Sequence, residues 1–178
     1  LNDLKDIVPD KVNRPDRPLP SGAISEGAAK NFSMAMMSIS ALSLAIIVWH
    51  AERQVGEAEW MDSVAIWLLA LFLMVASEFD GMPSKVCWKR RGFLGNLAVS
   101  GLIAVVIVFG AASVGHGTDP LPWLVAVCAL MIGTAREIVK DVEDLAGDTD
   151  RETLPKKIGP NPARTLAWIL SLLGFIAM

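Results

Sequence analysis

The chain of 178 residues has no tyrosine, only two histidines and only two cysteines, and these scarcities exclude several kinds of site. Cys87 falls in a polar connector and Cys128 in an apolar run, so the pair indicates neither a disulfide framework nor a zinc site. The basic residues are interleaved with carboxylates and form no basic stretch with aromatic residues between them. The pattern therefore excludes a nucleic-acid partner as well.

Charged residues are also missing from five long stretches, in a sequence that is 53% hydrophobic with a mean hydropathy of +0.45. A helix that crosses a bilayer needs about 20 apolar residues, and about 17 are tolerated. The first and third stretches meet this length, whereas the second and fourth need flanking residues such as Trp60 and Met61. An all-α, polytopic transmembrane helix bundle of about five spans is predicted, and a soluble helical protein with an unusually apolar core is the alternative. The stretches are 31–51, 63–77, 92–118, 120–135 and 165–178.

The basic residues indicate which side of the membrane each connector faces. If the spans alternate in direction, segments 1–30, 79–91 and 136–164 share one side and hold 15 of the 16 lysines and arginines. The opposite side holds only Arg53. This asymmetry predicts a multi-pass integral membrane protein whose first set of segments is cytoplasmic. The two histidines, His50 and His116, then lie on the outer side and are expected to be interfacial residues rather than catalysts.

We expect a single, partial domain over residues 1–178. Its parts are a first aspartate-rich loop (1–30), four spans (31–135), a second aspartate-rich loop (136–163) and a truncated span (164–178). The sequence starts without a methionine, inside a motif, and stops inside an apolar run. We therefore interpret it as a fragment of a longer protein.

Two acidic clusters stand out in the predicted cytoplasmic segments: Asp3, Asp6 and Asp10, and then Asp141, Asp144 and Asp148. Both have the spacing i, i+3, i+7, which would place three carboxylates along one face of a continuous helix. Like charges in this arrangement repel, so a cation is expected to compensate them. Mg2+ is favoured because it prefers oxygen ligands and is commonly held by one or two carboxylates together with substrate phosphates.

Basic residues accompany each acidic cluster. A metal-bridged diphosphate would be neutralised by such a mixture of carboxylates, guanidinium groups and ammonium groups. The alternative is that both clusters are merely solvated loop surfaces, but their equal spacing and shared side favour the metal-diphosphate site. The basic residues are Lys11, Arg14 and Arg17 after the first cluster, and Arg136, Lys140 and Lys156 around the second.

Longer motifs around these clusters resemble the UbiA superfamily of intramembrane prenyltransferases. "NDLKDIVPD" resembles the NDxxDxxxD motif of that family, "NRPDRPLPSGAIS" the segment after it, and "AREIVKDVEDLAGD" with "TLP" its second aspartate motif. "KRRGFLGNLAVSGL" resembles the stretch between the two. The resemblance implies a nine-helix membrane bundle, of which this chain would carry the end of the second helix, helices three to six and part of the seventh. "REIVKDVEDLAGD" is most similar to the geranylgeranylglyceryl phosphate geranylgeranyltransferases, with chlorophyll- and quinone-pathway enzymes as alternatives.

The resemblance also implies a mechanism, in which Mg2+ assists the ionisation of an allylic isoprenyl diphosphate. A lipophilic acceptor, such as a geranylgeranylglyceryl phosphate-like ether lipid precursor, would capture the resulting carbocation within the bilayer. Asp3, Asp6, Asp141 and Asp144 would be the catalytic carboxylates. The implied metal ligands are Asn2, Asp6, Asp10, Asp144 and Asp148, and the implied diphosphate-binding residues are Lys11, Arg14, Arg17, Arg136, Lys140 and Lys156.

Two features depart from the family pattern. Pro9 falls inside the first motif, where we expect it to disturb a helix. The family usually has a tyrosine near the position of Ser84, and this chain has none. A cation transporter with acidic loops is the alternative from another functional class. It is disfavoured because no interior of a predicted span carries an ionisable residue.

Overall fold

The computed structural model describes residues 2–54, 57–78, 92–146 and 152–178, and within these ranges the chain is helical without any strand. The predicted all-α class is therefore confirmed. Five long helices are α3 (Glu26–Gln54), α4 (Glu57–Glu78), α5 (Phe93–Ala112), α6 (Pro120–Glu143) and α8 (Pro160–Ile176). Shorter elements are α1 (Asn2–Lys5), α2 (Ile7–Asn13), the 3-10 turn η2 (Asp144–Ala146) and α7 (Leu154–Ile158).

The long helices coincide with the five charge-free stretches. Three helical segments are long and apolar enough to cross a membrane: Glu26–His50 in α3, Phe93–Ala112 (α5), and Pro120–Ala146, which joins α6 and η2. The apolar part of α4, Trp60–Ala76, is shorter, and α8 is 17 residues long. The structure therefore supports an apolar helical bundle, with three of the five predicted spans meeting the length criterion.

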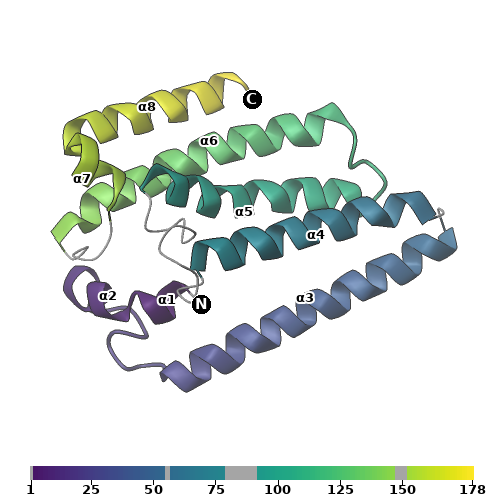
Figure 1. The fold of residues 1–178 in the computed structure, drawn as a ribbon, viewed down its shortest axis with the longest axis horizontal. Coiled ribbons are helices and arrows are strands. Elements are labelled where there is room, and N and C mark those ends of the chain that lie inside the picture. Colours follow the sequence, from purple (N-terminus) through teal and green to yellow (C-terminus); the bar gives the residue numbers. More distant parts are fainter. Residues whose placement is uncertain (1, 55–56, 79–91, 147–151) are drawn as a thin grey trace.

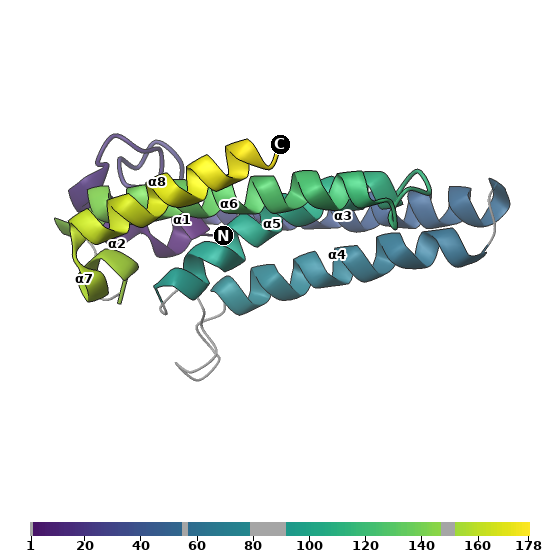
Figure 2. The same cartoon turned by 90° about the horizontal axis from the view of Figure 1, so that it is seen from above.

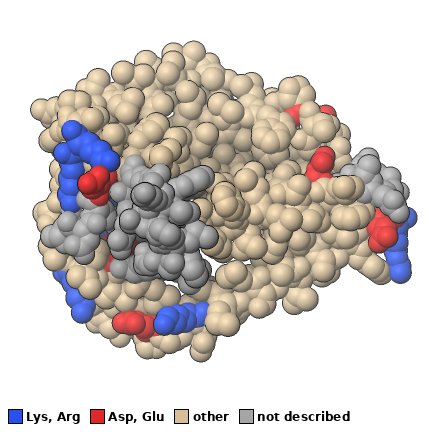
Figure 3. Space-filling model, in the orientation of Figure 1, with Lys and Arg blue, Asp and Glu red and all other residues tan. Residues whose placement is uncertain are grey.

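Each long helix lies beside its neighbour in the chain from α3 to α6, and α8 packs against α6 (Figures 1 and 2). The short helices α1, α2 and α7 gather at the end of the bundle where α6 finishes (Figure 1). The space-filling view shows charged side chains mainly toward the two ends of the visible face, with uncharged residues between them (Figure 3). This distribution, together with exposed apolar side chains such as Phe32 and Leu42 on α3, is what a bilayer-embedded helix bundle requires.

Small residues allow α6 to lie close to both of its neighbours. A Cβ atom added at Gly133 would lie 3.2 Å from the Ser100 side chain on α5. One added at Gly174 of α8 would lie 2.9 Å from the Cγ1 atom of Ile132 on α6. Close approach through small residues is the usual way in which membrane helices pack. These contacts fix the positions of α5 and α8 on either side of α6.

The first acidic cluster does not lie on one continuous helix, so its three carboxylates do not share the single helical face that their spacing would allow. Helix α1 ends at Lys5 and α2 begins at Ile7, so Asp6 stands at the break, and its carbonyl accepts a hydrogen bond from the Asp10 amide at 2.8 Å. The disturbance expected from Pro9 is found, because the helix does not continue from Lys5 through Asp6. Pro9 occupies the first turn of α2, where a backbone N–H has no partner within the helix and its loss costs little.

The second cluster is likewise divided between two elements. Asp141 lies in α6, whereas Asp144 begins the 3-10 turn η2, so the two carboxylates do not share one regular helical face here either. Asp148 lies outside the residues that the structure describes. The clusters are therefore placed by the junctions of helices rather than by the periodicity of one helix.

Candidate functional site

Arg17 holds two carboxylates of the first acidic segment. Its Nη1 atom donates to Oδ2 of Asp10 at 2.7 Å and lies 4.0 Å from Oδ1 of Asp3. Asp10 is only 6% exposed, so this pair is largely shielded from water, whereas the Asp3 carboxylate is exposed. A short, charge-assisted hydrogen bond of this kind is among the stronger polar contacts in proteins. Arg17 therefore turns back over α2 and neutralises the carboxylate of Asp10.

Asn96 on α5 holds Asp141 of the second acidic segment through a hydrogen bond. Its Nδ2 atom donates to Oδ2 of Asp141 at 3.0 Å, and the residue is 7% exposed. Asn96 was not predicted as a site residue. The available signal was an amide in an otherwise apolar stretch, close to the basic connector that precedes α5.

The two acidic segments meet at one end of the bundle. The side-chain amide of Asn13 donates to the backbone oxygen of Asp144 at 3.1 Å, although the two residues are 131 positions apart. The Nη2 atom of Arg14 lies 3.5 Å from Oδ1 of Asp144 and 3.6 Å from Oε2 of Glu143. The Asp144 side chain is 15% exposed. Arg14 and Asn13 therefore join the first segment to the end of α6.

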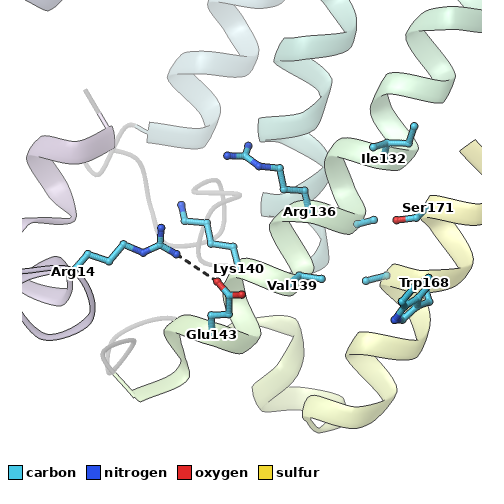
Figure 4. A pocket seen from close by; sticks show the side chains of 10 residues that line it. Arg14, Ile132, Arg136, Val139, Lys140, Glu143, Trp168 and Ser171 are labelled. Carbon is cyan, nitrogen blue, oxygen red and sulfur yellow. Dashed lines mark ion pairs between the residues drawn. The ribbon is translucent and has the colours of Figure 1, made fainter. Parts of the chain in front are cut away.

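A cavity of about 630 Å3 lies beside this junction and is lined by residues of α6 and α8 together with Arg14 (Figure 4). Its charged lining consists of Arg14, Arg136, Lys140 and Glu143. Figure 4 shows the charged ends of these side chains on one side of α6, and Trp168 and Ser171 of α8 on the other. The cavity therefore has one cationic end and one largely apolar end.

The other predicted site residues are more dispersed. Asp6 is buried at the break between α1 and α2, whereas Lys11 on α2 and Lys156 on α7 are exposed. Asn2 belongs to α1, but its side chain, like Asp148, falls outside the described part of the structure. The structure thus brings together Arg14, Asp144 and the α6 cations, and it leaves Lys11 and Lys156 at the surface.

The donor atoms at this end of the bundle suit a hard cation. Asp6, Asp141 and Asp144 offer carboxylate oxygens, and both histidines lie elsewhere in the sequence. Within the described ranges, no group of three or more His, Cys, Asp or Glu side chains is arranged to hold a metal ion. Mg2+ is usually held by one or two carboxylates and completed by substrate phosphates.

The sequence of this chain is similar to those of known proteins over most of its length. The chain matches the UbiA prenyltransferase family over residues 1–178. It is 36% identical to digeranylgeranylglyceryl phosphate synthase of Methanosarcina mazei, over 99% of this chain and 55% of the relative. It is 37% identical to the protein of that name from Methanococcus aeolicus, over 90% of this chain and 50% of the relative. It is 32% identical to the protein of that name from Pyrococcus horikoshii, over 99% of this chain and 57% of the relative.

The chain spans about half the length of the curated relatives that it matches. No solved structure matches it. The match over its whole length agrees with the apolar helices and with the meeting of two aspartate-containing segments at one end of them. The chain belongs to the UbiA prenyltransferase family.

Proposed function

We propose that the protein containing this chain is a Mg2+-dependent membrane prenyltransferase. It transfers an isoprenyl group from an allylic diphosphate to a phosphorylated glycerol ether lipid of the geranylgeranylglyceryl phosphate type. The relatives named above support this acceptor class, because each is named digeranylgeranylglyceryl phosphate synthase. The observation that carries the proposal is the contact of Asn13 and Arg14 with Asp144, which joins two acidic segments beside a cation-lined cavity.

The carboxylates are proposed to bind the donor diphosphate through Mg2+. Asp6 and Asp144 are the leading ligands, with Asn2, Asp10 and Asp148 as further ones. When bound, the metal neutralises the diphosphate and makes it a better leaving group. Asn96 orients Asp141 through its hydrogen bond, and Arg17 keeps Asp10 and Asp3 close to α2.

The cations complete the neutralisation of the diphosphate. Arg14 is best placed, because it already lies between the two acidic segments, and Lys11, Arg17 and Lys156 would add positive charge around it. The allylic C–O bond breaks with its electron pair going to the diphosphate. The acceptor hydroxyl oxygen then forms the new C–O bond with the allylic carbon, and its proton passes to the released diphosphate.

The apolar helices are proposed to protect the carbocation. Water would capture it faster than a lipid hydroxyl, so the reacting carbon must be enclosed by apolar groups. Because 15 of the 16 basic residues fall in the segments that the sequence predicts on one side of the membrane, we propose that this side, which carries both acidic segments, is cytoplasmic.

The proposal is tested with the full-length protein in lipid nanodiscs. Labelled geranylgeranyl diphosphate is supplied with geranylgeranylglyceryl phosphate, an aromatic quinone precursor or chlorophyllide, and with Mg2+ or EDTA. We expect Mg2+-dependent transfer to the glycerol lipid. Transfer only to the aromatic precursor or to chlorophyllide would reject the acceptor class, and no transfer to any acceptor would reject the enzyme.

A further inference from the structure

Helix α6 carries two different stripes of charge next to one another. Arg136, Lys140 and Glu143 follow the spacing i, i+4, i+7 and line the cavity. Glu137 and Asp141 each come one residue later, which is about 100° around the helix. Asp141 is turned toward Asn96 of α5. The helix therefore separates a carboxylate face from a cavity face that carries two cations.

The cavity has a surplus of positive charge. Three cations, Arg14, Arg136 and Lys140, stand against one carboxylate, Glu143, and Arg14 is already paired with Glu143 and Asp144. The Lys140 ammonium group makes no hydrogen bond or ion pair with any residue that the structure describes. Arg136 is 3.5 Å from the adjacent Glu137, but its side chain is 74% exposed, so this contact is weak. Arg136 and Lys140 are therefore available to an anionic ligand.

The opposite end of the cavity suits a hydrocarbon chain. Val139 and Ile132 of α6 face Trp168 of α8 there, and the Trp168 side chain is largely exposed. The volume of about 630 Å3 lies in the range of about 300–1,000 Å3 that is usual for small-molecule sites. The complementary ligand is an amphiphile with an anionic head and an apolar tail.

We propose that this cavity is the acceptor subsite, in which Arg136 and Lys140 bind the phosphate monoester of the acceptor lipid and its chain lies against Val139 and Trp168. The inference rests on the proposed function. It changes the expectation that these two cations neutralise the donor diphosphate. The acceptor phosphate brings no metal of its own, so it depends on guanidinium and ammonium groups, and the carboxylate face of α6 would repel it.

Steady-state kinetics of the full-length protein separate the two assignments. Arg136→Gln and Lys140→Gln are each expected to raise the KM for geranylgeranylglyceryl phosphate about tenfold and to leave the KM for the donor diphosphate within about twofold. The matched controls are Arg164→Gln and Lys157→Gln, which remove the same charges from exposed positions outside the cavity lining. Both controls should behave as wild type.

A dephosphorylated acceptor sharpens this test. Wild-type protein should prefer the phosphorylated lipid to the corresponding alcohol, and the double variant R136Q/K140Q should lose most of that preference. Val139→Trp, which fills the apolar end without changing a charge, should raise the KM of both acceptors. This variant also tests the cavity if a charge-removing variant fails to accumulate.

A rise in the donor KM with an unchanged acceptor KM would overturn the proposal, and so would unchanged values for both substrates. Failure of the proposed function itself looks different, because wild-type protein would then transfer no prenyl group to any acceptor. In that case, binding of labelled geranylgeranylglyceryl phosphate to wild-type and R136Q/K140Q protein still decides whether the cavity holds a phosphorylated lipid. Equal binding by the two proteins would reject it.

Discussion

The two acidic segments of the site are built in different ways. The first consists of two very short helices with a break at Asp6, and Arg17 in the same segment holds the carboxylates of Asp3 and Asp10. The second follows from α6, a helix of 24 residues, and Asn96 of α5 braces Asp141. Helix packing thus places the second segment in advance, whereas the first depends on local ion pairs and on its contacts with Asp144. The second segment is therefore held in place by the helix bundle, and the first segment docks onto it.

Removing the carboxylate on which the first segment docks should have the largest effect. Asp144→Asn keeps the size of the side chain but takes a ligand from the proposed metal and a partner from Arg14. We expect kcat/KM for prenyl transfer to fall about 10^3-fold, measured with membrane-embedded protein. Asp119→Asn, in the loop before α6, is the control and should retain full activity. Wild-type activity in the Asp144 variant would contradict the assignment of this carboxylate.

Separating the two segments should have the next largest effect. Arg14→Gln removes the ion pairs to Asp144 and Glu143, and we expect kcat/KM to fall by about 10- to 100-fold. Trypsin should also cleave faster after Lys11, because the first segment is released. Arg53→Gln, which removes a cation stacked 4.2 Å from the Trp49 ring, is the matched control. Lost activity with an unchanged cleavage rate would mean that Arg14 acts on substrate and does not dock the segment.

Removing the hydrogen bond from Asn96 to Asp141 should have a smaller effect, which is confined to the binding of Mg2+. Asn96→Leu leaves Asp141 without its donor from α5, and we expect the half-saturating Mg2+ concentration to rise about tenfold. Ser100→Ala removes the neighbouring bond from Ser100 Oγ to the Asn96 backbone oxygen and does not touch Asp141. An equal shift in the Ser100 variant would indicate a general loosening of α5 against α6, and not an effect on Asp141.

The smallest effect is expected at Pro9. Pro9→Ala should lower the free energy of unfolding by about 0.5–1 kcal/mol, because proline restricts the unfolded chain at a position that tolerates it. Prenyl transfer should be unchanged, since the first segment is held by Asn13, Arg14 and Arg17 and none of these contacts involves Pro9. Thermal unfolding in detergent and the transfer assay together check this. Altered transfer with normal stability would show that Pro9 controls the geometry of the first segment.

The apolar stretches allowed the helices to be predicted, because freedom from charge over such lengths has few other structural uses. The aspartate spacing located both acidic segments, but it did not decide whether each lies on one continuous helix, because periodicity alone does not reveal a break such as the one at Asp6. The contacts of Asn13 with Asp144 and of Asn96 with Asp141 could not be predicted. They join residues 131 and 45 positions apart, and local pattern carries no information over such separations.

The cavity was equally inaccessible to prediction. It exists because α8 returns along α6, with Gly174 against Ile132, and this depends on which helices become neighbours in three dimensions. The sequence identified Arg136 and Lys140 as phosphate-binding candidates, but it could not separate their face of α6 from that of Asp141. Only the positions of α5 and α8 make the two faces distinct.

The adjacency of these stripes on α6 makes the helix sensitive to insertions and deletions. One extra residue ahead of Arg136 would turn everything after it by about 100° and advance it by about 1.5 Å. The cations would then point toward Asn96, where Asp141 now lies, and the carboxylates would move off α5. Side chains along α6 can be exchanged one at a time, but the number of residues between Gly133, which packs against Ser100, and the end of the helix at Glu143 must stay the same.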